Sequence, residues 1–242
     1  KIDKGVVNTI RKACHVAPLH NPHNLEGITV CQKLFKVPHV AVFDTSFHAT
    51  LPAKAYTYAL PAWLTKKYGW RRYGFHGTSH SYVANEAAKM LKEPLTKLNM
   101  VTCHLGNGAS LCAIQKGKSI DTSMGFTPLE GLVMGTRCGD IDPALVCLLQ
   151  EKGFSEKDAY ELLNDKSGLF GLTGTNDVRK LLAKKGKDPA KLALAVYTYR
   201  VAKYLGAYVA AMNGVDVIVF TAGAGEGSWF VRESDQKRTR LN

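Results

Sequence analysis

Two glycine-rich segments of the sequence could bind phosphate. The segment His104-Leu-Gly-Asn-Gly-Ala-Ser110 lies between two apolar runs, and its glycines leave backbone N–H groups uncovered. Such a turn can form an anion-binding nest, to which Ser110 adds a hydroxyl, although Asn107-Gly108 is also typical of a plain hairpin turn. The segment Thr221-Ala-Gly-Ala-Gly-Glu-Gly-Ser228 follows an apolar strand, where α/β proteins usually bind ligands. It lacks both the Walker ending and the G-x-G-x-x-G pattern, so alone it is a weak nucleotide signal.

Arg137 and Asp44 could supply charge to the same chemistry. Arg137 lies in a predicted loop between glycines and a proline, where its planar fork could bind a carboxylate or a phosphoryl group. A salt bridge to Asp140 or Asp142 is the alternative. Asp44 follows a predicted strand and is either a turn cap or a carboxylate presented at the active edge of a sheet.

The histidines raise the question of a metal site. His76 and His80 are four residues apart, but Gly77 and the predicted capping residues place His76 before a helix begins, so the two need not share a face. The H-E-x-x-H glutamate is absent. A second cluster, formed by His15, His20 and His23, could be a metal site, loop packing or a single functional histidine. We assign no metal ligand.

The composition describes a globular chain and excludes several classes of protein. Its 242 residues, 45% of them hydrophobic and 21% charged, can build one large or two small cores. The apolar runs are far shorter than the roughly 18 to 20 residues that cross a bilayer, so we predict no membrane segment. The six cysteines form no C-x-x-C pair and are expected to be free thiols in a reducing cytoplasm.

The net charge of +12 is compatible with nucleic acid, a membrane surface or small anionic substrates as partners. The basic residues occur in short pieces, without aromatic residues between them and without a recognisable nucleic-acid module. We therefore predict solvated basic faces and no nucleic-acid binding.

Strands and helices are predicted to alternate along the chain. Apolar runs predict strands at Val40 to Phe43, Met100 to His104, Leu111 to Ile114 and Val215 to Phe220. Capping signals predict helices starting at Ser79 and stopped by Pro94, starting at Ser155 with Asp158 as its capping-box partner, and starting at Asp188 with Pro189 as first helical residue and ending near Gly214. This pattern predicts the α/β class, with a mixed or parallel sheet covered by helices on both faces.

Five motifs in order together resemble the acetate kinase family. They are Pro18-Leu-His-Asn-Pro22, Val42-Phe-Asp-Thr-Ser-Phe-His48, Tyr73-Gly-Phe-His-Gly-Thr-Ser-His80, His104-Leu-Gly-Asn-Gly108 and Asp121-Thr-Ser-Met-Gly-Phe-Thr-Pro-Leu-Glu-Gly-Leu-Val-Met-Gly-Thr-Arg137. The similarity runs from Val6 to Glu226 and covers nearly the whole chain.

The resemblance implies a sugar-kinase, Hsp70 and actin type fold with ribonuclease H-like lobes and ATP in the cleft between them. It implies a cytoplasmic, homodimeric, Mg²⁺-dependent phosphotransferase that reversibly makes acetyl phosphate and ADP from acetate and ATP. Propionate kinase is the nearest alternative, because one methylene in an apolar pocket shifts preference by only about 1 to 3 kcal/mol. A histidine-cluster metalloprotein and a nucleic-acid module are alternatives from other classes.

The resemblance also implies roles for individual residues. Those matching the family residues around the transferring phosphoryl group are His76, Asp44 and Arg137, with His20 nearby. Those matching the pocket for the acetate methyl are Leu19, Phe75 and Pro128. Those matching the phosphate-binding loop are His104, Leu105, Gly106, Asn107 and Gly108. Those matching the nucleoside-binding segments are Asp177, Val178, Arg179, Gly223, Ala224, Gly225, Glu226 and Gly227. The sequence leaves open whether Asp44 holds Mg²⁺ through water or orients the substrate carboxylate and its arginine partner.

Parts of the family pattern are missing from this sequence. The family's amino-terminal strand and N-x-G-S-S-S loop are absent, as are a further arginine and glutamate. Gly223-Ala-Gly-Glu-Gly227 replaces the usual G-I-G-E-N, and Trp229 to Asn242 has no match. We therefore expect residues 1–44 to be a remnant of the amino-terminal lobe and residues 45–242 to be the second, nucleotide-binding lobe, with the chain incomplete at both ends.

Overall fold

The computed structural model describes residues 1–15 and 21–233, which divide into two compact units, Lys1–Phe43 and Asp44–Asn242. The first unit packs helix α1 (Lys4–Lys12) against α2 (Asn21–Leu34), with the short 3₁₀ turn η1 (Ala13–His15) after α1. Asp3 caps α1 by accepting a hydrogen bond from the N–H of Val6. The division lies one residue from the predicted boundary, and the assignment of the two units to two lobes stays a prediction.

The second unit is built on a mixed four-stranded sheet, with strand order β3-β2-β1-β4. The strands are β1 (Asn99–Leu105), β2 (Ala109–Gln115), β3 (Lys118–Thr122) and β4 (Val217–Thr221). Strand β1 is antiparallel to β2 and parallel to β4. Three of the predicted strands are thereby confirmed. Prediction missed β3, whose only large apolar residue is Ile120, although Lys116 and Gly117 have the positive φ angles of a two-residue hairpin turn.

The strand predicted at Val40 to Phe43 is wrong. These residues have extended but unassigned backbone, and the side chains of Val40 and Val42 are 69% and 72% exposed. A strand requires a neighbour to pair its N–H and C=O groups, and none of the four described strands pairs with this segment.

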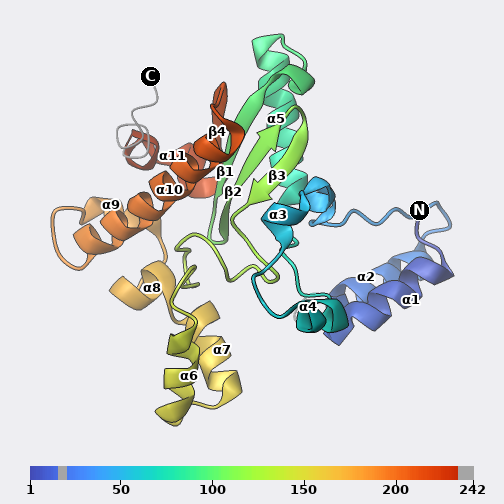
Figure 1. The fold of residues 1–242 in the computed structure, drawn as a ribbon, viewed down its shortest axis with the longest axis horizontal. Coiled ribbons are helices and arrows are strands. Elements are labelled where there is room, and N and C mark those ends of the chain that lie inside the picture. The colour runs from blue at the N-terminus through green and yellow to red at the C-terminus, as the bar shows by residue number, and fades with distance from the viewer. Residues whose placement is uncertain (16–20, 234–242) are drawn as a thin grey trace. The chain divides into compact units, whose positions relative to one another are not determined.

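Helices cover both faces of the sheet, as Figure 1 shows for α5 (Gly77–Leu91) and α10 (Ala190–Met212). One face packs Met100, Cys112 and Ile114 against Ala84 and Ala88 of α5. The other packs against the apolar side of α10, where Leu194, Tyr197, Val201 and Leu205 follow helical spacing. Burying each such side chain stabilises the fold by about 1.5 to 3 kcal/mol. The predicted two-sided α/β sheet is confirmed.

Two of the predicted helix starts are displaced. Helix α5 begins at Gly77, and its N-cap His76 lies three residues before the predicted cap Ser79. Helix α10 begins at Ala190 with Pro189 in the cap position, instead of Asp188, and ends as expected before Asn213. The predicted cap of α7 (Glu156–Asp165) is confirmed, because Ser155 Oγ accepts from the N–H of Asp158.

Short helices and turns complete the second unit. They are η2 (Ser46–Thr50), α3 (Ala53–Tyr56), α4 (Ala62–Tyr68), η3 (Leu95–Lys97), α6 (Ala144–Glu151), α7 (Glu156–Asp165), α8 (Gly168–Thr173), α9 (Val178–Ala183) and α11 (Ala222–Gly227). None of the helices in the described ranges combines the length and apolar character needed to cross a membrane.

Candidate active site

Three predicted site residues meet at the carboxyl end of β1. Gly108 lies in the hairpin loop that joins β1 to β2, where Leu105 pairs with Ala109. A Cβ atom at position 108 would lie 3.2 Å from Arg137 Nη1 and 3.5 Å from His76 Nε2. The hairpin interpretation of Asn107-Gly108 is therefore confirmed, and the same loop places the glycine backbone beside a guanidinium and an imidazole.

Asp44 acts as a cap for the backbone of His76. Its Oδ2 accepts a hydrogen bond from the His76 N–H at 2.6 Å, and its carbonyl oxygen accepts from the Gly77 N–H at 2.8 Å. His76 has a φ of 56°, in the left-handed region that disfavours side chains, so these bonds hold it in a strained conformation. Asp44 thus bonds a distant segment of backbone instead of capping its own turn, and its side chain is exposed beside the site.

The His76 ring is held by stacking and by a buried hydroxyl. It stacks on His104 with ring centroids 4.1 Å apart, and its Nδ1 lies 2.8 Å from Ser110 Oγ. The same oxygen lies 2.8 Å from His80 Nε2, although sequence reasoning had left the two histidines apart. Ser110 is fully buried, and its hydroxyl bonds both histidines. The sequence did not predict these contacts, because the three residues are brought together only by the fold.

Burial makes these imidazoles neutral. Desolvation lowers the pKa of His76 to about 4, with further lowering from His104 and Arg137 against the opposing charge of Asp44. The pKa of His80, His48 and His104 is also lowered, mainly by desolvation. At neutral pH His76 is thus an N–H donor without charge, and the cation beside Gly108 is Arg137.

We expect the free energy of unfolding to decrease as the pH falls below about 6.5. Below this value the four histidines bind protons in the unfolded chain while burial keeps them neutral in the folded chain, so acid favours unfolding. For His76 the window runs from 6.5 down to about 4. Each fully buried histidine contributes about 1.4 kcal/mol per pH unit inside its window.

Urea unfolding at several pH values measures this effect. His23→Gln serves as control, because His23 is an exposed residue of α2, and its replacement should leave the pH slope unchanged. A stability that stays constant from about pH 7.5 to about 5 would contradict buried neutral histidines.

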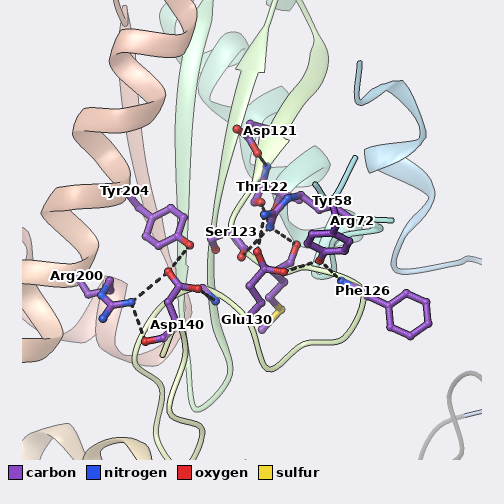
Figure 2. Close-up of polar contacts among 12 residues, drawn as sticks. Tyr58, Arg72, Asp121, Thr122, Ser123, Phe126, Glu130, Asp140, Arg200 and Tyr204 are labelled. Carbon is purple, nitrogen blue, oxygen red and sulfur yellow. Dashed lines mark hydrogen bonds and ion pairs between the residues drawn. The ribbon is translucent and has the colours of Figure 1, made fainter. Parts of the chain in front are cut away.

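The loop that carries Pro128 and Arg137 is anchored at one end by a charged cluster (Figure 2). Arg72 pairs with Glu130 at 2.5 Å, and the hydroxyl of Tyr58 donates to the other carboxylate oxygen of Glu130. Arg72 Nη1 also donates to the carbonyl oxygens of three consecutive residues, 122 to 124. Sequence reasoning missed this cluster, which joins three separate segments of the chain.

The other end of this loop is fixed by Asp140, which Figure 2 shows between Arg200 and Tyr204 of α10. Its Oδ2 accepts from Tyr204 Oη at 2.6 Å and pairs with Arg200 Nη1 at 3.1 Å. The alternative that Arg137 forms a salt bridge to Asp140 or Asp142 is therefore wrong: within the described ranges Arg137 makes no ion pair, and its Nη1 lies 3.4 Å from the carbonyl oxygen of Pro128.

The predicted nucleoside segments lie against the hairpin loop. Asn107 Oδ1 accepts from Asn176 Nδ2, one residue before Asp177, which caps α9. Asp177 also pairs with Arg179, whose side chain is 91% exposed. Residues 223–227 form the helix α11 instead of the predicted turn, because Glu226 Oε1 accepts from the N–H of Ala222 and from Thr221 Oγ1 and caps it.

Some predicted residues have other surroundings. Phe75 packs against the core, and its carbonyl oxygen accepts from His48 Nε2. Leu19 and His20 lie outside the described residues, so the pocket and the cluster of His15, His20 and His23 are only partly described. Among the residues that are described, no group of three or more His, Cys, Asp or Glu side chains is placed to hold a metal ion.

Comparison with known proteins gives concordant matches. A sequence model of the acetokinase family matches residues 1–240. The acetate kinase of Carboxydothermus hydrogenoformans is 56% identical over 236 residues, which are 96% of this chain and 59% of that protein. The acetate kinase of Halothermothrix orenii is 57% identical over 238 residues, 96% of this chain and 60% of that protein. The chain thus spans about three fifths of the length of these relatives.

Solved structures match over the same extent. The crystal structure of Porphyromonas gingivalis acetate kinase superposes with a TM-score of 0.93 at 46% identity, covering 97% of this chain and 60% of that one. The crystal structure of a propionate kinase from Francisella tularensis superposes with a TM-score of 0.92 at 44% identity, covering 99% of this chain and 66% of that one. These superpositions confirm the predicted sugar-kinase, Hsp70 and actin type fold class. With a family match over residues 1–240, the chain belongs to the acetokinase family.

Proposed function

We propose that the polypeptide containing this chain transfers the γ-phosphoryl group of ATP to acetate and reversibly forms acetyl phosphate and ADP. A carboxylate oxygen of acetate forms a bond to the γ-phosphorus, and the bond from that phosphorus to the oxygen of ADP breaks. The convergence of Arg137, His76 and Gly108 carries the proposal. Phosphoryl transfer depends on positioning and on donors for the equatorial oxygens, and these groups supply a cation, an imidazole N–H and backbone amides.

The hairpin loop is suited to phosphate because Gly106 and Gly108 have no side chains to cover their backbone N–H groups. A Cβ atom at Gly106 would lie 3.6 Å from both His104 Nε2 and the Cβ of Ala222, which precedes the predicted nucleoside residues of α11. We propose that ATP lies along this loop, with Asp177 and Arg179 near the nucleoside. Mg²⁺ bound with ATP would neutralise charge on the phosphate oxygens. Asp44 would hold the ion through water or orient the substrate carboxylate.

We assign Phe75 and Pro128 to contacts with the acetate methyl, and the family resemblance assigns the same role to Leu19, which lies outside the described residues. The carbonyl oxygen of Pro128 contacts Arg137 at 3.4 Å, which would place the methyl pocket next to the cation. Propionate remains the second candidate substrate, because the structure of a protein named propionate kinase matches this chain about as well as that of an acetate kinase. We further propose that the protein is cytoplasmic and forms a homodimer. The molar mass from light scattering after gel filtration would test the dimer.

The reaction is tested on the longest natural polypeptide that contains this sequence. We expect acetyl phosphate, trapped by hydroxylamine, to form only when ATP, Mg²⁺ and acetate are all present. Kinetics with acetate and propionate, compared as kcat/KM, separate the two substrates. Failure to form any trappable acyl phosphate from either acid would refute the proposed function.

A further inference from the structure

A chain of four hydrogen-bonding groups runs from the sheet to the site. Thr102 Oγ1 lies 2.8 Å from His80 Nδ1, His80 Nε2 lies 2.8 Å from Ser110 Oγ, and that oxygen lies 2.8 Å from His76 Nδ1. Thr102 and Ser110 point to the face of the sheet that α5 covers, and His80 comes from α5 itself. The first three residues are fully buried, so surrounding water does not satisfy their polar atoms.

The number of protons available determines which group donates in each hydrogen bond of this series. The imidazoles of His76 and His80 are neutral, so each has one nitrogen that donates and one that accepts. The hydroxyl of Thr102 has His80 Nδ1 as its hydrogen-bond partner in the described structure. If Thr102 accepted from that nitrogen, its own buried proton would be unpaired, which is costly. Thr102 therefore donates to His80 Nδ1.

The remaining bonds follow in order. Because His80 Nδ1 accepts, the ring proton is on Nε2 and is donated to Ser110 Oγ. Ser110 then directs its single proton to the other partner of its oxygen, His76 Nδ1. With Nδ1 accepting, the proton of His76 is on Nε2, the atom 3.5 Å from where a Cβ of Gly108 would lie.

We propose that Thr102, His80 and Ser110 are positioning residues that hold His76 in the tautomer with its proton on Nε2, as a donor aimed at the region between Gly108 and Arg137. The inference rests on the proposed function, because a phosphoryl oxygen is the acceptor that this donor would meet. In the reversed chain His76 would present a lone pair, which repels such an oxygen.

Nitrogen-15 NMR of protein labelled at histidine tests the tautomers directly, without turnover. Protonated and bare ring nitrogens differ in chemical shift, and we expect His76 and His80 to carry their protons on Nε2. His48 is an internal reference, because its Nε2 must donate to the carbonyl oxygen of Phe75 in every variant. A proton on Nδ1 of His76 in the unaltered protein would overturn the inference.

Variants at Thr102 provide the second test. Thr102→Val keeps the side-chain volume but leaves His80 Nδ1 without a hydrogen-bond partner, whether that nitrogen accepts or donates, so both tautomers of His76 should be populated. With equal populations kcat should fall about twofold, in proportion to the Nε2–H fraction that NMR reports, and KM for ATP should stay unchanged. Thr102→Ser keeps the hydroxyl and should retain both the tautomer and kcat.

Thr198→Val is the matched control, because Thr198 is also buried but donates only within α10. It should leave tautomers and kcat unchanged. A Thr102→Val protein with an unchanged tautomer of His76 would overturn the inference. Expected tautomers in a protein without kinase turnover would refute the proposed function alone, whereas reversed tautomers in an active kinase would refute this inference alone.

Discussion

We expect Arg137→Ala to lower kcat by a factor on the order of 10² to 10³ while KM for ATP changes little. The guanidinium faces Gly108 and His76 and makes no ion pair within the described residues, so in the proposed reaction its charge would be available to the phosphoryl group. Charge on the equatorial oxygens is met most fully in the transition state, which is why the loss should be in turnover. Steady-state kinetics of acetyl phosphate formation measure both constants.

Two further variants separate charge from general weakening of the site. Arg137→Lys keeps the cation but not the planar fork, so its kcat should lie between that of Arg137→Ala and that of the unaltered protein. Arg179→Ala is the control, because Arg179 is paired with Asp177 and exposed, and it should affect KM for ATP more than kcat. A loss in Arg137→Ala that is confined to KM would show ordinary ground-state binding instead.

We expect Glu130→Ala to reduce the free energy of unfolding by about 2 to 4 kcal/mol, because it leaves the Arg72 guanidinium without its counter-charge. The two side chains are 16% and 31% exposed, so solvent screens part of the charge and the cost lies below that of a fully buried pair. Tyr58 would also lose its acceptor. Urea unfolding measures the change, and turnover should fall as well, because this cluster anchors the loop of Arg137.

An exposed pair in the same unit provides the control for this prediction. Lys89 and Glu86 on α5 form an ion pair with side chains 72% and 41% exposed. Glu86→Ala should cost less than about 0.5 kcal/mol. Glu130→Gln keeps the size and one hydrogen bond but not the charge, so its cost should be intermediate. Equal stability of the two alanine variants would contradict a structural role for Glu130.

The sequence by itself determined the features that depend on neighbouring residues. Apolar runs predicted β1, β2 and β4, because a strand covered on both faces is apolar along its length. The Asn107-Gly108 pair predicted the hairpin, and the order of the motifs predicted the family. Local signals did not locate the start of α5, because the predicted cap Ser79 lies within the helix. The N–H of His76, which precedes the helix, is instead bonded by Asp44, 32 positions away in the sequence.

The tertiary structure alone decided which polar groups pair. Tyr58 and Glu130 are 72 residues apart, and Ser110 joins His76 and His80 from 34 and 30 residues away. The same packing pairs Asp140 with Arg200 of α10, and Arg137 faces the hairpin loop. The segment at Val40 to Phe43 has strand-like residues without a described neighbouring strand. Periodicity records which face of an element is buried, whereas a buried charge or hydroxyl takes whichever partner packing brings within about 3 Å.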